Sequence, residues 1–186
     1  EFHQGSLMDY DTVYKFGKSV DVLTIEIEHV NLEALKQLDA EGLKIFPQPS
    51  ILEIIQHKGR QKDFFASHLI PTAPYHRFEK ISDLKTWIES KGDSRDFPFV
   101  WKSAQFGYDC TGVNIVRSLA DLEGLPEEPC LVEEMIPFKN ELAVIVARNE
   151  SGETRTYPVV EMEFHPTANQ VEFVICPARI EDSVAT

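Results

Sequence analysis

The chain has 186 residues, of which 42% are hydrophobic and 26% charged, and its formal net charge is -13 at pH 7. This composition is typical of a globular protein with one or two domains, and it excludes a largely disordered chain. The negative charge argues against binding to nucleic acid or to an anionic membrane, because both are themselves polyanions. We therefore expect any phosphate group to be held by a few local basic residues.

The three cysteines are Cys110, Cys130 and Cys176, which are far apart in the sequence. Their odd number and wide spacing fit neither a disulfide framework nor a paired metal-binding motif. We interpret them as reduced thiols of a cytoplasmic protein. No apolar run approaches the roughly 20 residues that span a bilayer, and the polar start EFHQGS does not resemble a signal peptide.

The first predicted elements form an alternating pattern. Residues 19–27 are rich in β-branched side chains and predict a buried strand. Asn31 can cap a helix over residues 32–41, which Gly42 is suited to end. Residues 43–47 predict a short strand that stops at its proline. Strand, helix and strand in succession predict a parallel α/β layer.

Helices are predicted next. Ser50 can cap a helical segment that is expected to break near Gly59 and then resume. Residues 70–75 form a loop that two prolines restrict. Ser82 can cap another short helix that ends at Gly92. The apolar face of this helix consists of Leu84, Trp87 and Ile88.

From Phe97 onward the pattern changes to strands and turns, and Ser118 can cap a short helix among them. Strands are expected over residues 97–103, 113–118, 130–136 and 169–180, and a hairpin over residues 140–164 with its turn at 149–152. A parallel layer followed by antiparallel strands implies at least two structural units. We expect them to join near residues 71–74.

The loop between residues 103 and 113 contains a pattern suited to phosphate. Lys102 ends one strand, and Gly107 and Gly112 bracket a six-residue loop. Glycine permits positive φ angles, which can point consecutive backbone N–H groups at an anion, and a lysine adds a positive charge. An ordinary hairpin with a surface lysine explains the same spacing, and on spacing alone it is the better explanation. The sequence is not a Walker loop.

Three other clusters admit a functional and a plain structural interpretation. Lys58 lies at the expected helix break with Arg60 and Lys62 nearby, a local basic excess that could also be a solvated helix face. Glu26, Glu28 and His29 follow the first strand, and ligands tend to bind at the carboxyl edge of a parallel sheet. Solvation of a strand end explains that cluster equally well.

The third cluster surrounds the end of the strand over residues 130–136. Glu133 and Glu134 could be solvated carboxylates, and Met135 and Ile136 could belong to the core. Alternatively, a strand edge can bind an adenine through its backbone, an apolar side chain can cover the ring, and the carboxylate of Glu141 can accept from ribose hydroxyls. None of these clusters is decisive by itself.

The order of these features resembles the ATP-grasp superfamily, in which two antiparallel sheets hold ATP between them. Within it, the resemblance is to the 5-(carboxyamino)imidazole ribonucleotide synthase family and covers essentially the whole chain. The segments that carry it are DVLTIEIEHVN, IPTAPY, KSAQFGYDCTGV, LVEEMIPFKNELAVIVARN, YPVVEMEFHP and FVICPARI. The implied fold is mixed α/β and α+β.

The resemblance implies a division into three parts. Residues 1–74 would be the remainder of an α/β N-terminal domain, residues 75–136 the small lid domain of the ATP-grasp fold, and residues 137–186 the first part of its C-terminal domain. The chain is thus expected to begin and end within domains of a longer enzyme. Alone it would be incomplete for turnover.

The resemblance also implies an activity, the ATP-dependent carboxylation of 5-aminoimidazole ribonucleotide by bicarbonate in purine biosynthesis. Its cofactors would be ATP and Mg²⁺, with the metal ligands outside this chain, and the enzyme would be a homodimer. Glu26 and Tyr108 would lie near the ribonucleotide. The implied ATP-binding residues are Lys58, Lys102, Gly107, Tyr108, Asp109, Cys110, Thr111, Gly112, Val113, Glu133, Glu134, Met135, Ile136, Glu141 and Glu161. We assign no catalytic residue from the sequence.

The phosphate loop departs from the family pattern of Gly-Tyr-Asp-Gly, a basic residue and Gly. Cys110 replaces the second glycine, and Thr111 replaces the basic residue. A different ATP-grasp carboxylase or ligase, or a non-catalytic nucleotide-binding module, therefore stands as the alternative to the carboxylating enzyme.

Overall fold

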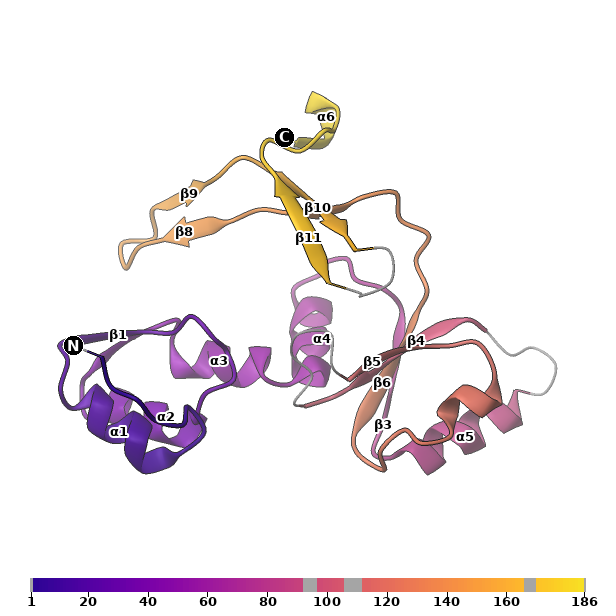
Figure 1. Ribbon diagram of the computed structural model, residues 1–186, viewed down its shortest axis with the longest axis horizontal. Helices are drawn as coiled ribbons and strands as arrows, with labels where there is room; N and C mark the ends of the chain where they lie inside the picture. Colours follow the sequence, from indigo (N-terminus) through magenta and orange to yellow (C-terminus); the bar gives the residue numbers. More distant parts are fainter. Residues whose placement is uncertain (1, 92–96, 106–111, 166–169, 186) are drawn as a thin grey trace. The chain divides into compact units, whose positions relative to one another are not determined.

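The computed structural model describes residues 2–91, 97–105, 112–165 and 170–185. They fold into two compact units, Glu1–Met135 and Ile136–Thr186, which are described separately (Figure 1). The three-part division expected from the sequence stays a prediction. In the described part of the chain, no helix is both long and apolar enough to cross a membrane.

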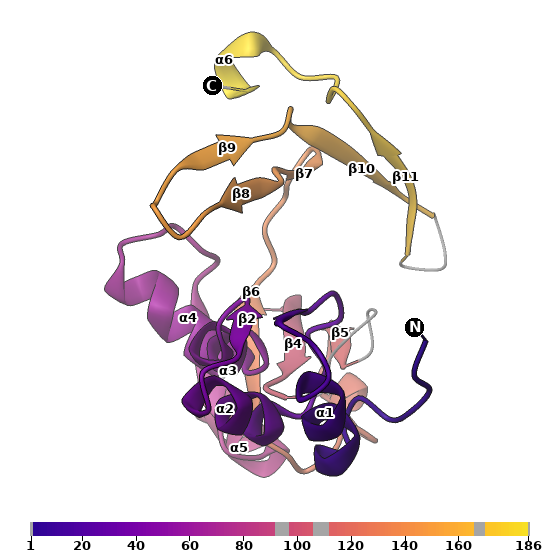
Figure 2. The same cartoon turned by 90° about the vertical axis from the view of Figure 1, so that its left-hand side faces the viewer.

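The first half of the larger unit is a two-stranded parallel sheet with helices, as predicted. β1 pairs with β2 so that Leu23 lies opposite Ile45. The helices α1 and α2 pack side by side (Figures 1 and 2). The elements are α1 (Tyr10–Gly17), β1 (Val22–Thr24), α2 (Leu32–Ala40), β2 (Lys44–Phe46), α3 (Pro49–Ile55) and α4 (Lys58–Ser67). Their core consists of Val13, Leu23, Val30, Ala34, Leu35, Leu38, Ile45 and Leu52.

The predicted cap of α2 is confirmed. The Asn31 side chain accepts the N–H of Ala34 at 2.9 Å, and Gly42 follows the helix with a φ of +93°. The strand expected over residues 19–27 is shorter, because its partner β2 ends at Phe46 and the next residue, a proline, has no N–H to continue the ladder. Glu26 therefore follows the sheet instead of ending a strand.

Two expected helix starts are wrong. α3 begins at Pro49, a residue suited to the first helical position, so Ser50 lies inside the helix instead of capping it. α5 (Ile81–Ser90) begins after Lys80 without a side-chain cap, which places Ser82 inside as well. The expected break near Gly59 lies earlier, because His57 caps α4. Helix α1, which Asp9 caps, was not predicted.

The second half of the larger unit is a four-stranded antiparallel sheet in the order β3-β6-β4-β5. Its strands are β3 (Tyr75–Phe78), β4 (Phe99–Ser103), β5 (Val113–Val116) and β6 (Cys130–Glu134), and η1 (Leu119–Leu122) follows β5. The hairpin of β4 and β5 and the cap of η1 by Ser118 are confirmed. Strand β3 was not predicted: its first residue was placed in the loop over residues 70–75, and residues 76–78 were assigned to no element.

One face of this sheet is buried against α5. Phe99, Trp101 and Val132 share a core with Leu84 and Ile88, which confirms the predicted apolar face of α5. Side chains alternate between the two faces of a strand. Lys102 and Glu133 therefore emerge on the opposite face, where α4 contacts β6.

The smaller unit is built from antiparallel strands. Its sheet has the order β11-β10-β7, and β8 pairs with β9 in a separate hairpin (Figure 2). The elements are β7 (Glu141–Ala143), β8 (Val146–Arg148), β9 (Thr154–Thr156), β10 (Val160–Phe164), β11 (Val171–Ile175) and α6 (Asp182–Ala185). The predicted hairpin with its turn at Asn149–Gly152 is confirmed. It is interrupted at Pro158, which has no N–H to donate.

Candidate nucleotide-binding site

Glu133 lies between two lysines on the face of the sheet opposite α5. Its Oε2 is 2.9 Å from the Nζ of Lys102, and its Oε1 is 3.1 Å from the Nζ of Lys62. The strand register places Glu133 opposite Val100, so that Lys102 is its diagonal neighbour on the adjacent strand. Lys62 reaches the same carboxylate from α4. A helix and two strands thus meet at one buried glutamate.

Lys58 joins this group from the start of α4. Its N–H donates to the carbonyl oxygen of Ala104 at 2.9 Å, which ties the first residue of the helix to the end of β4. Partial burial lowers the pKa of Lys58, and the positive charge of nearby Lys102 lowers it further. The structure therefore brings together the two lysines that the sequence singled out, Lys58 and Lys102.

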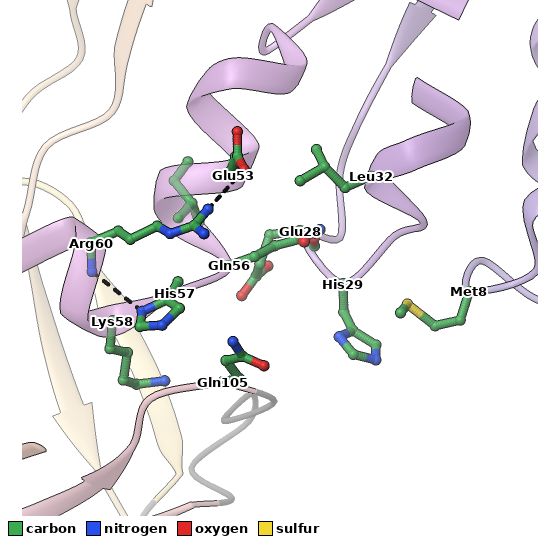
Figure 3. A pocket seen from close by; sticks show the side chains of 11 residues that line it. Met8, Glu28, His29, Leu32, Glu53, Gln56, His57, Lys58, Arg60 and Gln105 are labelled. Carbon is green, nitrogen blue, oxygen red and sulfur yellow. Dashed lines mark hydrogen bonds and ion pairs between the residues drawn. The ribbon is translucent and has the colours of Figure 1, made fainter. Parts of the chain in front are cut away.

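A pocket of about 230 Å³ opens beside Lys58 (Figure 3). Figure 3 shows the Lys58 ammonium directed toward Gln105, with bonds from Arg60 to Glu53 and to His57. The residues that line the pocket are Met8, Glu28, His29, Leu32, Glu53, Ile55, Gln56, His57, Lys58, Arg60 and Gln105. Carboxylate, imidazole, amide and ammonium groups therefore surround one small cavity.

Gln56 fixes the wall of the pocket that carries Glu28 and His29. Its Nε2 donates to the carbonyl oxygen of Glu28 at 2.7 Å and to that of Val30 at 2.9 Å. These bonds connect the end of α3 to the segment that follows β1. They hold the segment in one conformation although it belongs to no helix or strand.

His57 completes the junction between α3 and α4. Its Nδ1 accepts the N–H of Gly59 at 3.1 Å and the N–H of Arg60 at 3.3 Å. Burial lowers the pKa of His57, and the charges of Arg60 and Arg77 act in the same direction. The neutral imidazole that this favours is the form in which a ring nitrogen can accept these bonds.

Comparison with known proteins decides the family. A family model of the ATP-grasp domain matches residues 63–186, and a model of the ribonucleotide synthetase preATP-grasp domain matches residues 1–56. The chain belongs to the ATP-grasp family. Its fold is the ATP-grasp fold, with the antiparallel sheets and the preceding parallel α/β layer that the sequence predicted.

Individual relatives agree with this assignment. N5-carboxyaminoimidazole ribonucleotide synthase of Synechococcus elongatus is 35% identical over 179 residues, which cover 94% of this chain and 44% of the relative. A crystal structure of carboxyaminoimidazole ribonucleotide synthase from Aspergillus clavatus complexed with ATP is 32% identical, with a TM-score of 0.85 over 97% of this chain and 47% of that one. The complex of the Aspergillus clavatus enzyme with ADP and 5-aminoimidazole ribonucleotide is 31% identical, with a TM-score of 0.81 over 97% and 46%. The chain thus spans less than half the length of these relatives.

The expected phosphate loop of the ATP-grasp site is described only at its ends. Gly107, Tyr108, Asp109, Cys110 and Thr111 lie outside the described residues. At the C-terminal end, Gly112 has a φ of +71°, and its carbonyl oxygen accepts the N–H of Ser103 at 2.8 Å. Val113 then begins β5 opposite Lys102. The loop therefore starts and ends beside the lysine.

The residues expected around adenine follow one another at the end of β6. Glu133 is buried, whereas Glu134 is exposed and its N–H donates to the carbonyl oxygen of Pro74 at 2.9 Å. Met135 and Ile136 are each 43% exposed, and the division between the two units falls between them. Glu133, Glu134 and Met135 also line a cavity of about 490 Å³ together with Trp87 and Phe99 among others.

Glu141 and Glu161 lie on neighbouring strands of the smaller unit. Glu141 begins β7 opposite Met162, and Glu161 is buried in β10. The side chain and main chain of Arg179 donate to Glu161, as does Asn140 at 2.9 Å. These bonds lower the pKa of Glu161 to about 2. Glu161 is therefore ionised, and both of its carboxylate oxygens accept hydrogen bonds from residues of its own unit.

The two expected substrate residues are placed differently. Glu26 is exposed and lines an apolar cavity of about 600 Å³ near α1, apart from the pocket beside Lys58. Tyr108 lies outside the described residues. Glu28 and His29, which the same motif contains, line the Lys58 pocket instead.

Lys62 and Gln56 were not predicted to belong to the site. A signal for Lys62 was present, because residues four apart lie on the same face of a helix and Lys62 is four residues after Lys58. No local pattern points to Gln56, whose partners are 26 and 28 residues away.

The described residues do not fit a metal site by themselves. Among residues 2–91, 97–105, 112–165 and 170–185, no group of three or more His, Cys, Asp or Glu side chains is arranged to hold a metal ion. We therefore derive no step through Mg²⁺ from these residues.

Proposed function

We propose that this chain is the nucleotide-binding part of an enzyme that carboxylates 5-aminoimidazole ribonucleotide with bicarbonate, at the expense of ATP, in purine biosynthesis. The observation that carries the proposal is the meeting of Lys58 and Lys102 beside the pocket that Glu28 and His29 line. Similarity to carboxyaminoimidazole ribonucleotide synthases along 94% of the chain supports the same activity.

The proposed reaction has two steps. A bicarbonate oxygen attacks the γ-phosphorus of ATP, the bond from this phosphorus to the β–γ bridging oxygen breaks, and carboxyphosphate and ADP form. The substrate amine then attacks the carboxyphosphate carbon, and inorganic phosphate leaves as the amine proton is lost. The protein contributes by positioning the reactants and by stabilising negative charge on the phosphoryl group.

The two lysines are suited to that contribution. An ammonium group is a compact positive charge for phosphate oxygens. Lys102 is 27% exposed at its side chain, so that it remains accessible while it contacts Glu133. In this proposal Lys58 and Lys102 bind the phosphate groups, and the loop over residues 107–113 closes over them.

The remaining assignments are proposed on the family pattern. The adenine is lined by Glu133, Glu134, Met135 and Ile136, the ribose is held by Glu141, and Glu161 is a further contact to the nucleotide. Glu26 and Tyr108 lie near the aminoimidazole ribonucleotide, and the pocket adds Glu28 and His29 as candidates for the same role. Mg²⁺ would accompany ATP. The enzyme would act in the cytoplasm as a homodimer.

The decisive assay measures ADP formation by the intact protein with ATP and bicarbonate, with and without 5-aminoimidazole ribonucleotide. We expect the ribonucleotide to stimulate ADP formation at least tenfold and to become carboxylated at its amine. Stimulation by a different amine or acid would indicate another ATP-grasp ligase. ATP binding without turnover under all of these conditions would favour a non-catalytic module.

A further inference from the structure

Within the part of the chain that the structure describes, Lys62 contacts the candidate ATP site through Glu133. Its side chain and that of Glu133 are each 10% exposed, whereas the side chain of Lys102 is 27% exposed. Lys62 is thus the inner partner of the shared carboxylate and Lys102 the outer one.

The N–H donors of the Lys62 ammonium already have partners. It contacts Glu133 at 3.1 Å, donates to the hydroxyl of Thr72, and lies 5.5 Å from the centre of the Tyr75 ring, within the range of a cation–π interaction. An ammonium group has three N–H donors. These three contacts engage its donors, and Lys62 is therefore fixed in place.

The charges of the three groups explain why such a lysine is needed. A carboxylate beside a phosphate-binding lysine weakens the attraction between the lysine and phosphate, because the negative charge cancels the positive one. Lys62 supplies a second positive charge, so that the group of Lys62, Glu133 and Lys102 keeps one net positive charge. Without the Lys62 ammonium, Lys102 and Glu133 would form a neutral pair at 2.9 Å. Burial makes this difference larger than it would be in water.

We propose that Lys62 is a positioning residue for ATP, which holds the Glu133 carboxylate so that the Lys102 ammonium keeps its positive charge for the phosphate groups. Lys62 itself does not touch the nucleotide. The inference rests on the proposed function, because it requires ATP to bind against Lys102.

The test is calorimetric titration of ATP into the intact protein. Lys62→Met is expected to weaken ATP binding about tenfold, a change of about 1.4 kcal/mol in binding free energy. Lys62→Arg keeps the charge and is expected to stay within threefold of the wild type. In the double variant Lys62→Met with Glu133→Gln, the carboxylate charge is also gone, and we expect its affinity for ATP to lie within threefold of that of Glu133→Gln alone. Lys18→Met is the matched control, because Lys18 pairs with Glu41 on the exposed surface at 3.0 Å.

The double variant separates a charge effect from a merely structural one. A structural defect caused by losing Lys62 would weaken ATP binding in the Glu133→Gln background as well. A loss of less than threefold in Lys62→Met overturns the inference, as does a double variant that binds ATP more than threefold less tightly than Glu133→Gln alone. If Lys62→Met does not fold, the double variant decides by the same threefold limit against Glu133→Gln, because it replaces the buried pair by neutral groups of similar size.

Failure of the proposed function gives a different result. A wild-type protein that does not bind ATP would remove that function together with this inference. A wild-type protein that binds ATP, with Lys102→Ala weakened and Lys62→Met unchanged, would remove the inference alone.

Discussion

Replacing Gln56 with alanine is expected to release the segment that carries Glu28 and His29. The amide of Gln56 donates to the carbonyl oxygens of Glu28 and Val30, at 2.7 and 2.9 Å. Alanine removes both donors and leaves both acceptors in place. The wall of the pocket beside Lys58 then loses its connection to α3.

The size of the effect follows from these two bonds. An intramolecular hydrogen bond contributes about 0.5–1.5 kcal/mol to the free energy of unfolding, and an acceptor left without a donor in a buried position costs more. Val30 is only 4% exposed, so water replaces the lost donor poorly at its carbonyl oxygen. We expect Gln56→Ala to lower the free energy of unfolding by about 2–3 kcal/mol.

Urea unfolding followed by circular dichroism measures this loss, with Gln37→Ala as the matched control. Gln37 also donates through its side-chain amide, to Glu41 at 2.7 Å, but on the exposed surface. Its replacement is expected to change the free energy of unfolding by no more than about 0.5 kcal/mol. We also expect the KM for 5-aminoimidazole ribonucleotide to rise more than the KM for ATP in Gln56→Ala. Equal unfolding midpoints for the two variants would refute the reasoning.

Three further predictions concern charged groups. Lys102→Ala is expected to weaken ATP binding at least tenfold, since a hydrogen bond to a charged group is worth about 1.5–3 kcal/mol; calorimetry that returns the wild-type affinity would exclude its phosphate role. Because burial lowers the pKa of His57 below its ordinary value of 6.5, the unfolded chain binds the proton more readily, and stability is lost as the pH falls below about 6.5. His57→Asn keeps a capping side chain and should reduce that loss between pH 7.5 and 5.5, as read from urea midpoints; an unchanged pH dependence would contradict the prediction. Arg179→Met should lower the thermal midpoint more than Arg155→Met, because Arg179 holds the buried Glu161 whereas the pair of Arg155 is exposed. Equal midpoints would show that burial of Glu161 makes no difference.

Much of the local structure could be predicted because it depends on residues close in sequence. Asn31 caps α2 through the N–H of a residue three positions later, and the apolar spacing of Leu84 and Ile88 alone identifies the buried face of α5. The starts of α3 and α5 were missed because these helices begin at Pro49 and Ile81, each ahead of the serine that the pattern favoured as a cap. Sequence rules identify several residues that could begin a helix, and the packing around the helix determines at which of them it begins.

The candidate site was predictable in its residue types and less so in its contacts. Lys58 and Lys102 stood out as cations beside a helix break and a glycine loop, and the structure brings them together. The contact of Glu133 with Lys102 spans 31 residues and depends on the register between β4 and β6, which no local pattern specifies. The role of Gln56 depends in the same way on tertiary structure.

The bond from the Lys58 N–H to the carbonyl oxygen of Ala104 joins main-chain atoms. Side-chain replacements leave such a bond in place, and at position 58 only proline would remove its donor. The bond thereby holds the main chain of Lys58 beside the end of β4, the strand that contains Lys102, whichever side chains surround them. Substitutions in the pocket walls can therefore accumulate while the main chain at Lys58 stays connected to the end of the strand that carries Lys102.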